Sequence, residues 1–242
     1  MPFLRQIVMF LIIVITNKGL CDEGTQGIFI NKTKLVFSSH LNKVVLRVVN
    51  NTAEHYLLQA VVQNYDPKTG MAVNDNQVTP FMVSPPLHEL RAGDDIFLSL
   101  LVVPSRATLL PSNRESLYYL TLRLIPSEIR MYNSVKLHLV TAYNIRVYWR
   151  PMLDPINGKD IYFSCNNGEL NIFNRSGYYR EVTQLFIDKF KIKKSILIRP
   201  VPPYGKLGIN TSVQHCSPGV HQASWRFRDD SGVPSDLYQM DF

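Results

Sequence analysis

The side chains that could carry chemistry in this sequence include two cysteines deep in the chain. Cys165 and Cys216 would close a loop of about 50 residues if they pair. In the loop-entropy account such a disulfide stabilises the fold by roughly 4 kcal/mol. Two unpaired buried thiols are the alternative, and an oxidising compartment favours the disulfide.

The six histidines, at positions 40, 55, 88, 138, 215 and 221, show no spacing typical of a metal site. His215 is adjacent to Cys216, but the disulfide accounts better for that cysteine. The sequence contains no Gly-x-Ser-x-Gly, no phosphate-binding glycine loop and no dinucleotide fingerprint. We therefore expect no enzymatic activity, no metal and no other cofactor. A hydrolase built from scattered Ser, His and Asp residues is a minor alternative.

The charge of the chain permits an anionic partner without naming one. Lysine and arginine number 26 against 19 acidic residues, which gives a formal net charge of +7. These basic residues are dispersed and form none of the clustered stripes typical of nucleic-acid binding. We expect no nucleic-acid partner.

The first 21 residues have the pattern of a secretory signal peptide. Arg5 is followed by an apolar run over residues 7–16, and Lys18 precedes Cys21. The run is about half the length of roughly 20 residues that a membrane span needs, so we expect no membrane span. Removing Arg5 and Lys18 would lower the net charge from +7 to +5. No Ala-x-Ala defines the cleavage site, and a lipid on Cys21 is an alternative that Lys18 disfavours.

Short apolar runs cut by turn residues predict an all-β protein. The runs are residues 43–49, 56–63, 96–103, 117–125 and 135–149. Their spacing is typical of β-sandwiches and barrels. Residues 185–198 could form a short amphipathic helix, but their β-branched content favours strands.

A turn-rich segment after Pro151 predicts a boundary between two domains. It contains Asp-Pro-Ile-Asn-Gly at 154–158. We therefore predict a first domain over residues 25–150, a hinge over 151–158 and a second domain over 159–242. Each is long enough to close one sandwich core.

The run at 135–149 alternates in polarity and places its apolar side chains on one face. Val135, Leu137, Leu139 and Thr141 begin that face. One interpretation is a half-buried strand within a sandwich. The other is that this first part offers its apolar side chains to another chain, because an exposed apolar edge is otherwise an aggregation liability.

Five segments resemble the periplasmic chaperones of chaperone–usher pilus assembly, in the order found in that family. These are Thr-Lys-Leu-Val-Phe at 33–37, Ser-Pro-Pro-Leu-His-Glu-Leu at 84–90, Leu-Pro-Ser-Asn-Arg-Glu-Ser-Leu at 110–117, Ile-Arg-Val-Tyr-Trp-Arg-Pro at 145–151 and Trp-Arg-Phe-Arg-Asp-Asp-Ser-Gly at 225–232. The last match is weaker than the other four.

The resemblance implies two immunoglobulin-like β-sandwich domains in a boomerang arrangement, located in the periplasm. It implies binding of pilus or fimbrial subunits by donor-strand complementation and delivery to an outer-membrane usher. The donor strand would be 135–141, with Val135, Leu137, Leu139 and Thr141 entering the subunit. Burial of each apolar side chain would contribute roughly 1.5–3 kcal/mol. An unloaded chaperone could also associate with itself.

The resemblance also implies that Lys34 and Arg146 anchor the C-terminal carboxylate of the subunit. Charge-assisted hydrogen bonds of this kind contribute about 1.5–3 kcal/mol each. Lys34 stands where the family usually has arginine, so it offers a point charge rather than a bidentate fork. Solvated surface charge is the alternative reading of both residues.

A third set implied by the resemblance is an ion-pair network that couples the domains. It consists of Glu115, Arg150 and Asp230, with Asp229 as a competitor for the last position. Removing one of three mutually paired charges would leave the others without partners.

A different class of function fits the same fold. A secreted immunoglobulin-like adhesive or carbohydrate-binding module would have its site in the end loops rather than on strand 135–141.

Overall fold

The computed structural model describes residues 26–73, 77–127, 130–132, 135–137, 139–153, 155–156, 158–166, 168–210, 216 and 219–242. The predicted signal peptide and Cys21 lie outside these residues. No helix in the described ranges has the length and apolar character to cross a bilayer. Nor do those ranges bring three or more His, Cys, Asp or Glu side chains together as metal ligands.

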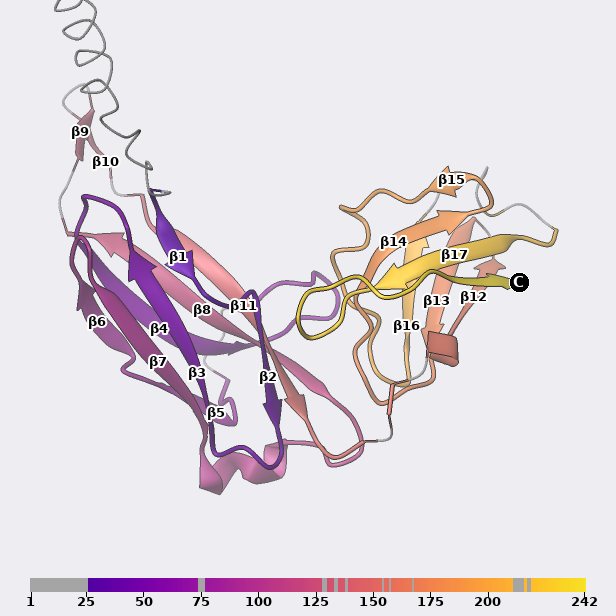
Figure 1. The fold of residues 1–242 in the computed structure, drawn as a ribbon, viewed down its shortest axis with the longest axis horizontal. Helices are drawn as coiled ribbons and strands as arrows, with labels where there is room; N and C mark the ends of the chain where they lie inside the picture. The colour runs from indigo at the N-terminus through magenta and orange to yellow at the C-terminus, as the bar shows by residue number, and fades with distance from the viewer. Residues whose placement is uncertain are drawn as a thin grey trace, which may run out of the picture.

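Two facing sheets form the first sandwich (Figure 1). One has the strand order β1-β3-β7-β5 and the other β2-β11-β8-β4-β6. The strands are β1 (Ile28–Ile30), β2 (Lys34–Ser38), β3 (Lys43–Asn50), β4 (Tyr56–Asn64), β5 (Phe81–Ser84), β6 (Leu87–Leu90), β7 (Asp95–Val102), β8 (Ser116–Pro126) and β11 (Thr141–Arg150), with the 3-10 helix η1 (Pro104–Leu109) after β7. Alternate apolar residues of both sheets meet in one core, which includes Phe37, Leu46 and Leu120.

The second sandwich has its own core around Leu170, Leu185 and Trp225. Its sheets have the orders β12-β13-β16 and β15-β14-β17-β18. The elements are η2 (Gly158–Asp160), β12 (Ile161–Asn166), β13 (Glu169–Asn174), β14 (Val182–Ile187), β15 (Phe190–Lys191), β16 (Lys206–Asn210), β17 (Gln222–Phe227) and β18 (Tyr238–Asp241). The predicted disulfide between Cys165 and Cys216 is confirmed.

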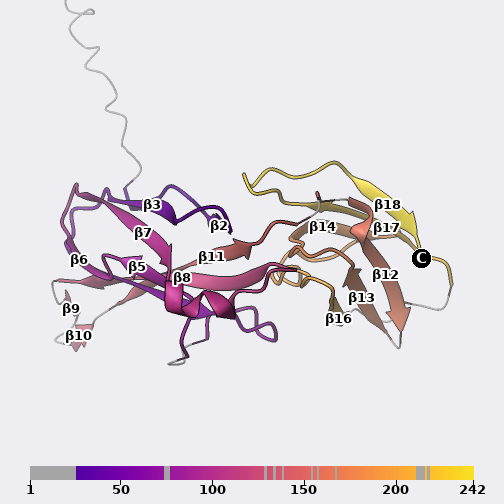
Figure 2. The same ribbon diagram turned by 90° about the horizontal axis from the view of Figure 1, so that it is seen from below.

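The two sandwiches lie side by side at an angle, and β11 runs from the first toward the second (Figures 1 and 2). The all-β, two-sandwich prediction is thus confirmed. The four predicted strands before residue 126 correspond to β3, β4, β7 and β8. The bond between Ser84 and Pro85 is cis.

The prediction of strands throughout residues 185–198 is wrong in its second half. The segment forms the end of β14 and the short β15, and then turns without a further strand. Ile192 and Leu197 are buried in the second core, whereas Ile196 and Ile198 are exposed. The spacing of five residues between Ile192 and Leu197 does not match the two-residue period of a strand. The segment therefore packs on the second core through these two single side chains.

The prediction of one continuous strand over 135–149 is also wrong. β11 begins only at Thr141, and residues 135–137 form a separate strand, β10 (Val135–Leu137), which pairs antiparallel with β9 (Arg130–Tyr132). The reason lies in the partner strand. Thr141 pairs with Leu124, and β8 ends two residues later at Pro126, so residues before Thr141 soon lack a ladder to join.

Candidate functional site

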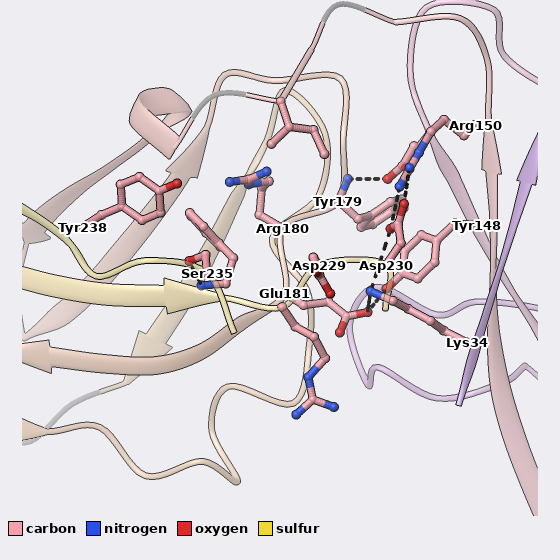
Figure 3. A pocket seen from close by; sticks show the side chains of 14 residues that line it. Lys34, Tyr148, Arg150, Tyr179, Arg180, Glu181, Asp229, Asp230, Ser235 and Tyr238 are labelled. Atoms are coloured by element: carbon pink, nitrogen blue, oxygen red, sulfur yellow. Dashed lines mark hydrogen bonds and ion pairs between the residues drawn. The ribbon is translucent and has the colours of Figure 1, made fainter. Parts of the chain in front are cut away.

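A cavity of about 260 Å³ lies between the two sandwiches and is lined by charged residues from both (Figure 3). β2 and β11 contribute Lys34, Tyr148 and Arg150 on one side. The other side includes Glu181, just before β14, and Asp230, just after β17. The cavity therefore collects charges from segments that are far apart in the sequence.

The register of the first sandwich explains how its cations reach this place. β2 and β11 are parallel neighbours, and Arg146 lies directly opposite Lys34. Ile145 and Val147 enter the first core. Because side chains alternate along a strand, Arg146 and Tyr148 then face the second sandwich.

Arg150 joins two carboxylates across the hinge. Its Nε donates to Oε1 of Glu115 at 2.6 Å, and its two Nη atoms donate to both oxygens of Asp230 at 2.5 and 3.0 Å. The second oxygen of Glu115 accepts the backbone N–H of Tyr179 at 2.8 Å. The structure thus brings together the three residues of the predicted ion-pair network.

The network shifts the pKa values of its two carboxyls in opposite directions. Burial raises the pKa of Glu115, and the charge of Arg150 only partly offsets this effect. Burial also acts on Asp230, but there the hydrogen bonds and charge of Arg150 prevail and the pKa is lowered. The guanidinium pKa of Arg150 is raised in spite of burial, because both carboxylates favour its charged form.

Asp229, the competitor for the third position, has a different role. Its carboxylate accepts the backbone N–H of Val233 at 2.7 Å and so closes the turn after β17. Asp230 is the residue that reaches Arg150.

The two predicted anchor cations are not free in this structure, because both face Glu181. Oε1 of Glu181 lies 3.4 Å from Nη1 of Arg146 and 3.9 Å from Nζ of Lys34. Lys34 also lies 4.0 Å from Asp230, and Arg146 donates to the backbone carbonyl of Ile198. Sequence reasoning missed Glu181, since no motif marks it and only the packing of the two sandwiches brings it to these cations.

Tyr148 completes the surroundings of Glu181. Its hydroxyl donates to the same Oε1 at 2.6 Å. Burial and then the charge of Glu181 raise the pKa of the Tyr148 phenol well above its usual value. Tyr148 therefore remains a neutral hydrogen-bond donor at physiological pH.

Arg180 lines the cavity without joining this network. Its guanidinium carbon lies 3.9 Å from the centre of the Phe227 ring, and its Nε has no hydrogen-bond partner within the described residues. Burial lowers its pKa. The charge of Arg180 thus lies against an aromatic face.

A second contact joins the sandwiches through the loop after β4. Arg199 donates to the carbonyl oxygens of Lys68 at 3.0 Å and of Gly208 at 3.4 Å. Tyr119 donates to the carbonyl oxygen of Gly70 at 2.8 Å, which holds the loop in place. A Cβ on Gly70 would lie 2.6 Å from Cγ of Arg199, so the close approach requires glycine here.

The predicted donor residues lie at the opposite end of β11 from these charges. Leu139 and Val140 belong to no strand and are strongly exposed, at 69% and 51% of their surface, and Thr141 begins β11. The backbones of Val135 and Leu137 lie in β10, and their side chains are outside the described part of the chain.

Comparison with known families matches residues 27–153 to the family described as pili and flagellar-assembly chaperone, PapD N-terminal domain. The chain is 26% identical over 212 residues to the chaperone protein FimC of Escherichia coli strain CFT073, covering 85% of this chain and 80% of FimC. It is 25% identical over 195 residues to the chaperone protein FocC of Escherichia coli, covering 78% and 79%.

Solved structures resemble the fold. A chain in the structure of the Salmonella enterica SafA pilin with the SafB chaperone superposes with a TM-score of 0.71 at 19% identity, over 89% of this chain and 96% of that one. The Escherichia coli chaperone DraB gives 0.69 at 19% identity, over 88% and 98%. At 19% sequence identity, these superpositions show a similar fold.

Proposed function

The chain belongs to the family of pilus- and flagellum-assembly chaperones that carry the PapD-type N-terminal domain, and from this premise we propose that it binds pilus subunits in the periplasm by adding a strand to them. FimC and FocC are named as chaperones, and the SafB chaperone was solved with a pilin. We extend that role to this chain, together with delivery of the subunit to an outer-membrane usher.

The observation that carries the proposal is an open strand edge leading to two cations. β8 pairs with β11 from Thr141 to Trp149, but β2 pairs only with its second half, from Arg146 onward. Within the described residues, positions 141–145 therefore have no strand on the β2 side. Unpaired backbone N–H and C=O groups in such an edge are available to an extended segment of another chain.

The exposed apolar residues next to this edge supply the contacts that backbone pairing lacks. Leu139 is exposed just before the open edge, and we assign it, with Val135, Leu137 and Thr141, to the surface that enters the subunit. The donor strand that we propose is 135–141, with Val135, Leu137, Leu139 and Thr141 entering the subunit, and it would form when this segment leaves the β9–β10 pairing and adds to the subunit. Lys34 and Arg146 would then hold the subunit's terminal carboxylate.

The remaining parts of the chain fit the same role. We assign residues 1–21 to an export signal, residues 25–150 to the binding domain, 151–158 to the hinge and 159–242 to the second domain. The ion pairs of Arg150 with Glu115 and Asp230 support a fixed angle between the domains.

Copurification tests the proposal. Tagged protein from periplasmic extract is expected to carry small exported β-rich chains in 1:1 complexes, identified by mass. Lys34→Glu and Arg146→Glu should abolish capture while circular dichroism stays unchanged. Lys43→Glu is the matched control, because Lys43 is an exposed cation at the start of β3. Normal capture by both cleft variants would contradict the anchor assignment.

A further inference from the structure

Glu181 lies in the position where the anchor cations would hold a ligand. Its Oε1 faces Arg146 at 3.4 Å and Lys34 at 3.9 Å, and accepts a hydrogen bond from Tyr148 at 2.6 Å. Both cations and the phenol come from the first sandwich, whereas Glu181 precedes β14 of the second. One internal carboxylate thus has the set of partners that an incoming carboxylate would use.

The charges around this point favour one carboxylate rather than two. Asp230 accepts two hydrogen bonds from Arg150 and also lies 4.0 Å from Lys34, so Arg146 and a shared Lys34 are the cations that balance Glu181. The side chain of Glu181 is 14% exposed, and that of Lys34 is 9% exposed, so solvent screens the pair only partly. A second carboxylate between the same cations would lie close to a like charge, which is unfavourable.

Glu181 also has free volume on two sides. It lines the 260 Å³ cavity and a second cavity of about 420 Å³, which it shares with Arg146, Lys194 and Arg228. This second cavity contains three cations and, among the residues that line it, Glu181 is the single acid. The side chain can therefore leave Lys34 and Arg146 and still remain near positive charge.

We propose that Glu181 is an internal occupant of the anchor site, which the C-terminal carboxylate of the partner displaces. The inference rests on the proposed function and names a residue that determines its specificity. A free acidic side chain gains little by replacing Glu181, since one carboxylate is exchanged for another. A chain terminus that also pairs along positions 141–145 gains backbone hydrogen bonds in addition to the exchange.

The test measures how strongly the protein distinguishes a carboxylate from an amide. The probe is a nine-residue peptide of alternating Val and Thr with a dye at its N-terminus, prepared with either a free C-terminal carboxylate or a C-terminal amide. Fluorescence anisotropy gives the Kd of each form for the mature protein. Glu181→Gln is expected to bind the carboxylate form about tenfold more tightly, and the amide form within about twofold of wild type.

The controls separate competition between Glu181 and the peptide carboxylate from a general change in the electrostatic potential of the cavity or in folding. Asp229→Asn removes one negative charge from the same cavity but not from Lys34 or Arg146, and should change the carboxylate Kd by less than about twofold. Glu181→Ala should reproduce the gain without an amide at this position. Glu181→Ala therefore replaces Glu181→Gln in the test if circular dichroism shows that Glu181→Gln does not fold.

The outcomes distinguish this inference from the function on which it rests. If wild type prefers the carboxylate form but neither Glu181 variant increases the preference, Glu181 only links the domains and the displacement is wrong. If neither wild type nor the Glu181 variants distinguish the two peptides, the anchor assignment fails, and the displacement fails with it. A gain confined to the carboxylate form establishes both.

Discussion

Replacing Arg150 with methionine should uncouple the two sandwiches. Methionine keeps much of the aliphatic stem but removes the guanidinium that joins Glu115 to Asp230. The side chain of Glu115 is 1% exposed, so the substitution leaves a buried carboxylate without its counter-ion. Breaking buried pairs in this way typically costs 3–5 kcal/mol. The side chain of Asp230 is 49% exposed and adds little, so we expect a loss of about 3 kcal/mol at pH 7.

The chain contains a reporter in each domain, because its two tryptophans lie on either side of the hinge. Trp149 packs against the first core and Trp225 lies within the second. Urea unfolding of Trp149→Phe and Trp225→Phe backgrounds therefore follows each sandwich separately. We expect the two transitions to coincide in the parent and to separate when Arg150→Met is added.

The effect of pH follows from the raised pKa of Glu115. A carboxyl whose folded pKa exceeds its unfolded value contributes stability below the unfolded pKa, and this contribution is lost as pH rises through the folded pKa. Without Arg150 that pKa should rise further, so the cost of Arg150→Met should be smaller near pH 4 than at pH 7. The double variant Arg150→Met with Glu115→Leu should recover most of the loss, since apolar replacements of a buried pair are often neutral. Coincident transitions in Arg150→Met, with a cost below about 1 kcal/mol at pH 7, would refute the coupling by this network.

Three further substitutions test other parts of the molecule. Leu139→Asp should weaken subunit capture at least about tenfold in pull-downs without changing the unfolding midpoint, whereas Leu109→Asp, at another exposed leucine in η1, should have no effect on capture. Cys165→Ser removes the bond to Cys216 and should lower the stability of the second sandwich by about 4 kcal/mol; an unchanged Trp225 transition would contradict this. Arg199→Ala loses two hydrogen bonds to backbone carbonyls and should cost about 1 kcal/mol in urea unfolding, with capture retained.

Local sequence patterns predicted the sandwich strands well, because every second side chain of a half-buried strand is apolar. They failed where the outcome depended on a partner. The pattern over 135–149 predicts one strand, but β8 ends at Pro126, so β11 begins only at Thr141 and residues 135–137 pair with β9 instead. The strand prediction also failed for the segment after Lys191, because its buried apolar residues contact the second core singly and not as part of a paired strand.

The residues of the candidate site differ in the same way. Those that lie in sequence motifs could be predicted, whereas a residue placed only by contacts between the domains could not. Glu115, Arg150 and Asp230 lie in recognisable motifs, and the structure places them in contact. Glu181 lies in no such motif, and its position depends on how the second sandwich packs against β2 and β11. A residue whose surroundings come from another domain leaves no periodic signal in its own segment.

The geometry of β2 and β11 also explains why a chain terminus, rather than an internal segment, should fit the open edge. A strand added beside positions 141–145 lies in line with β2, which begins at Lys34 opposite Arg146. The added strand must therefore end or turn away at Lys34. If it runs parallel to β11, its C-terminal carboxylate arrives at Lys34 and Arg146, where charge is complementary. If it runs antiparallel, an N-terminal ammonium arrives at the same two cations and is repelled. The pairing that leaves the edge open thus also selects the direction of the strand that fills it and the group with which that strand ends.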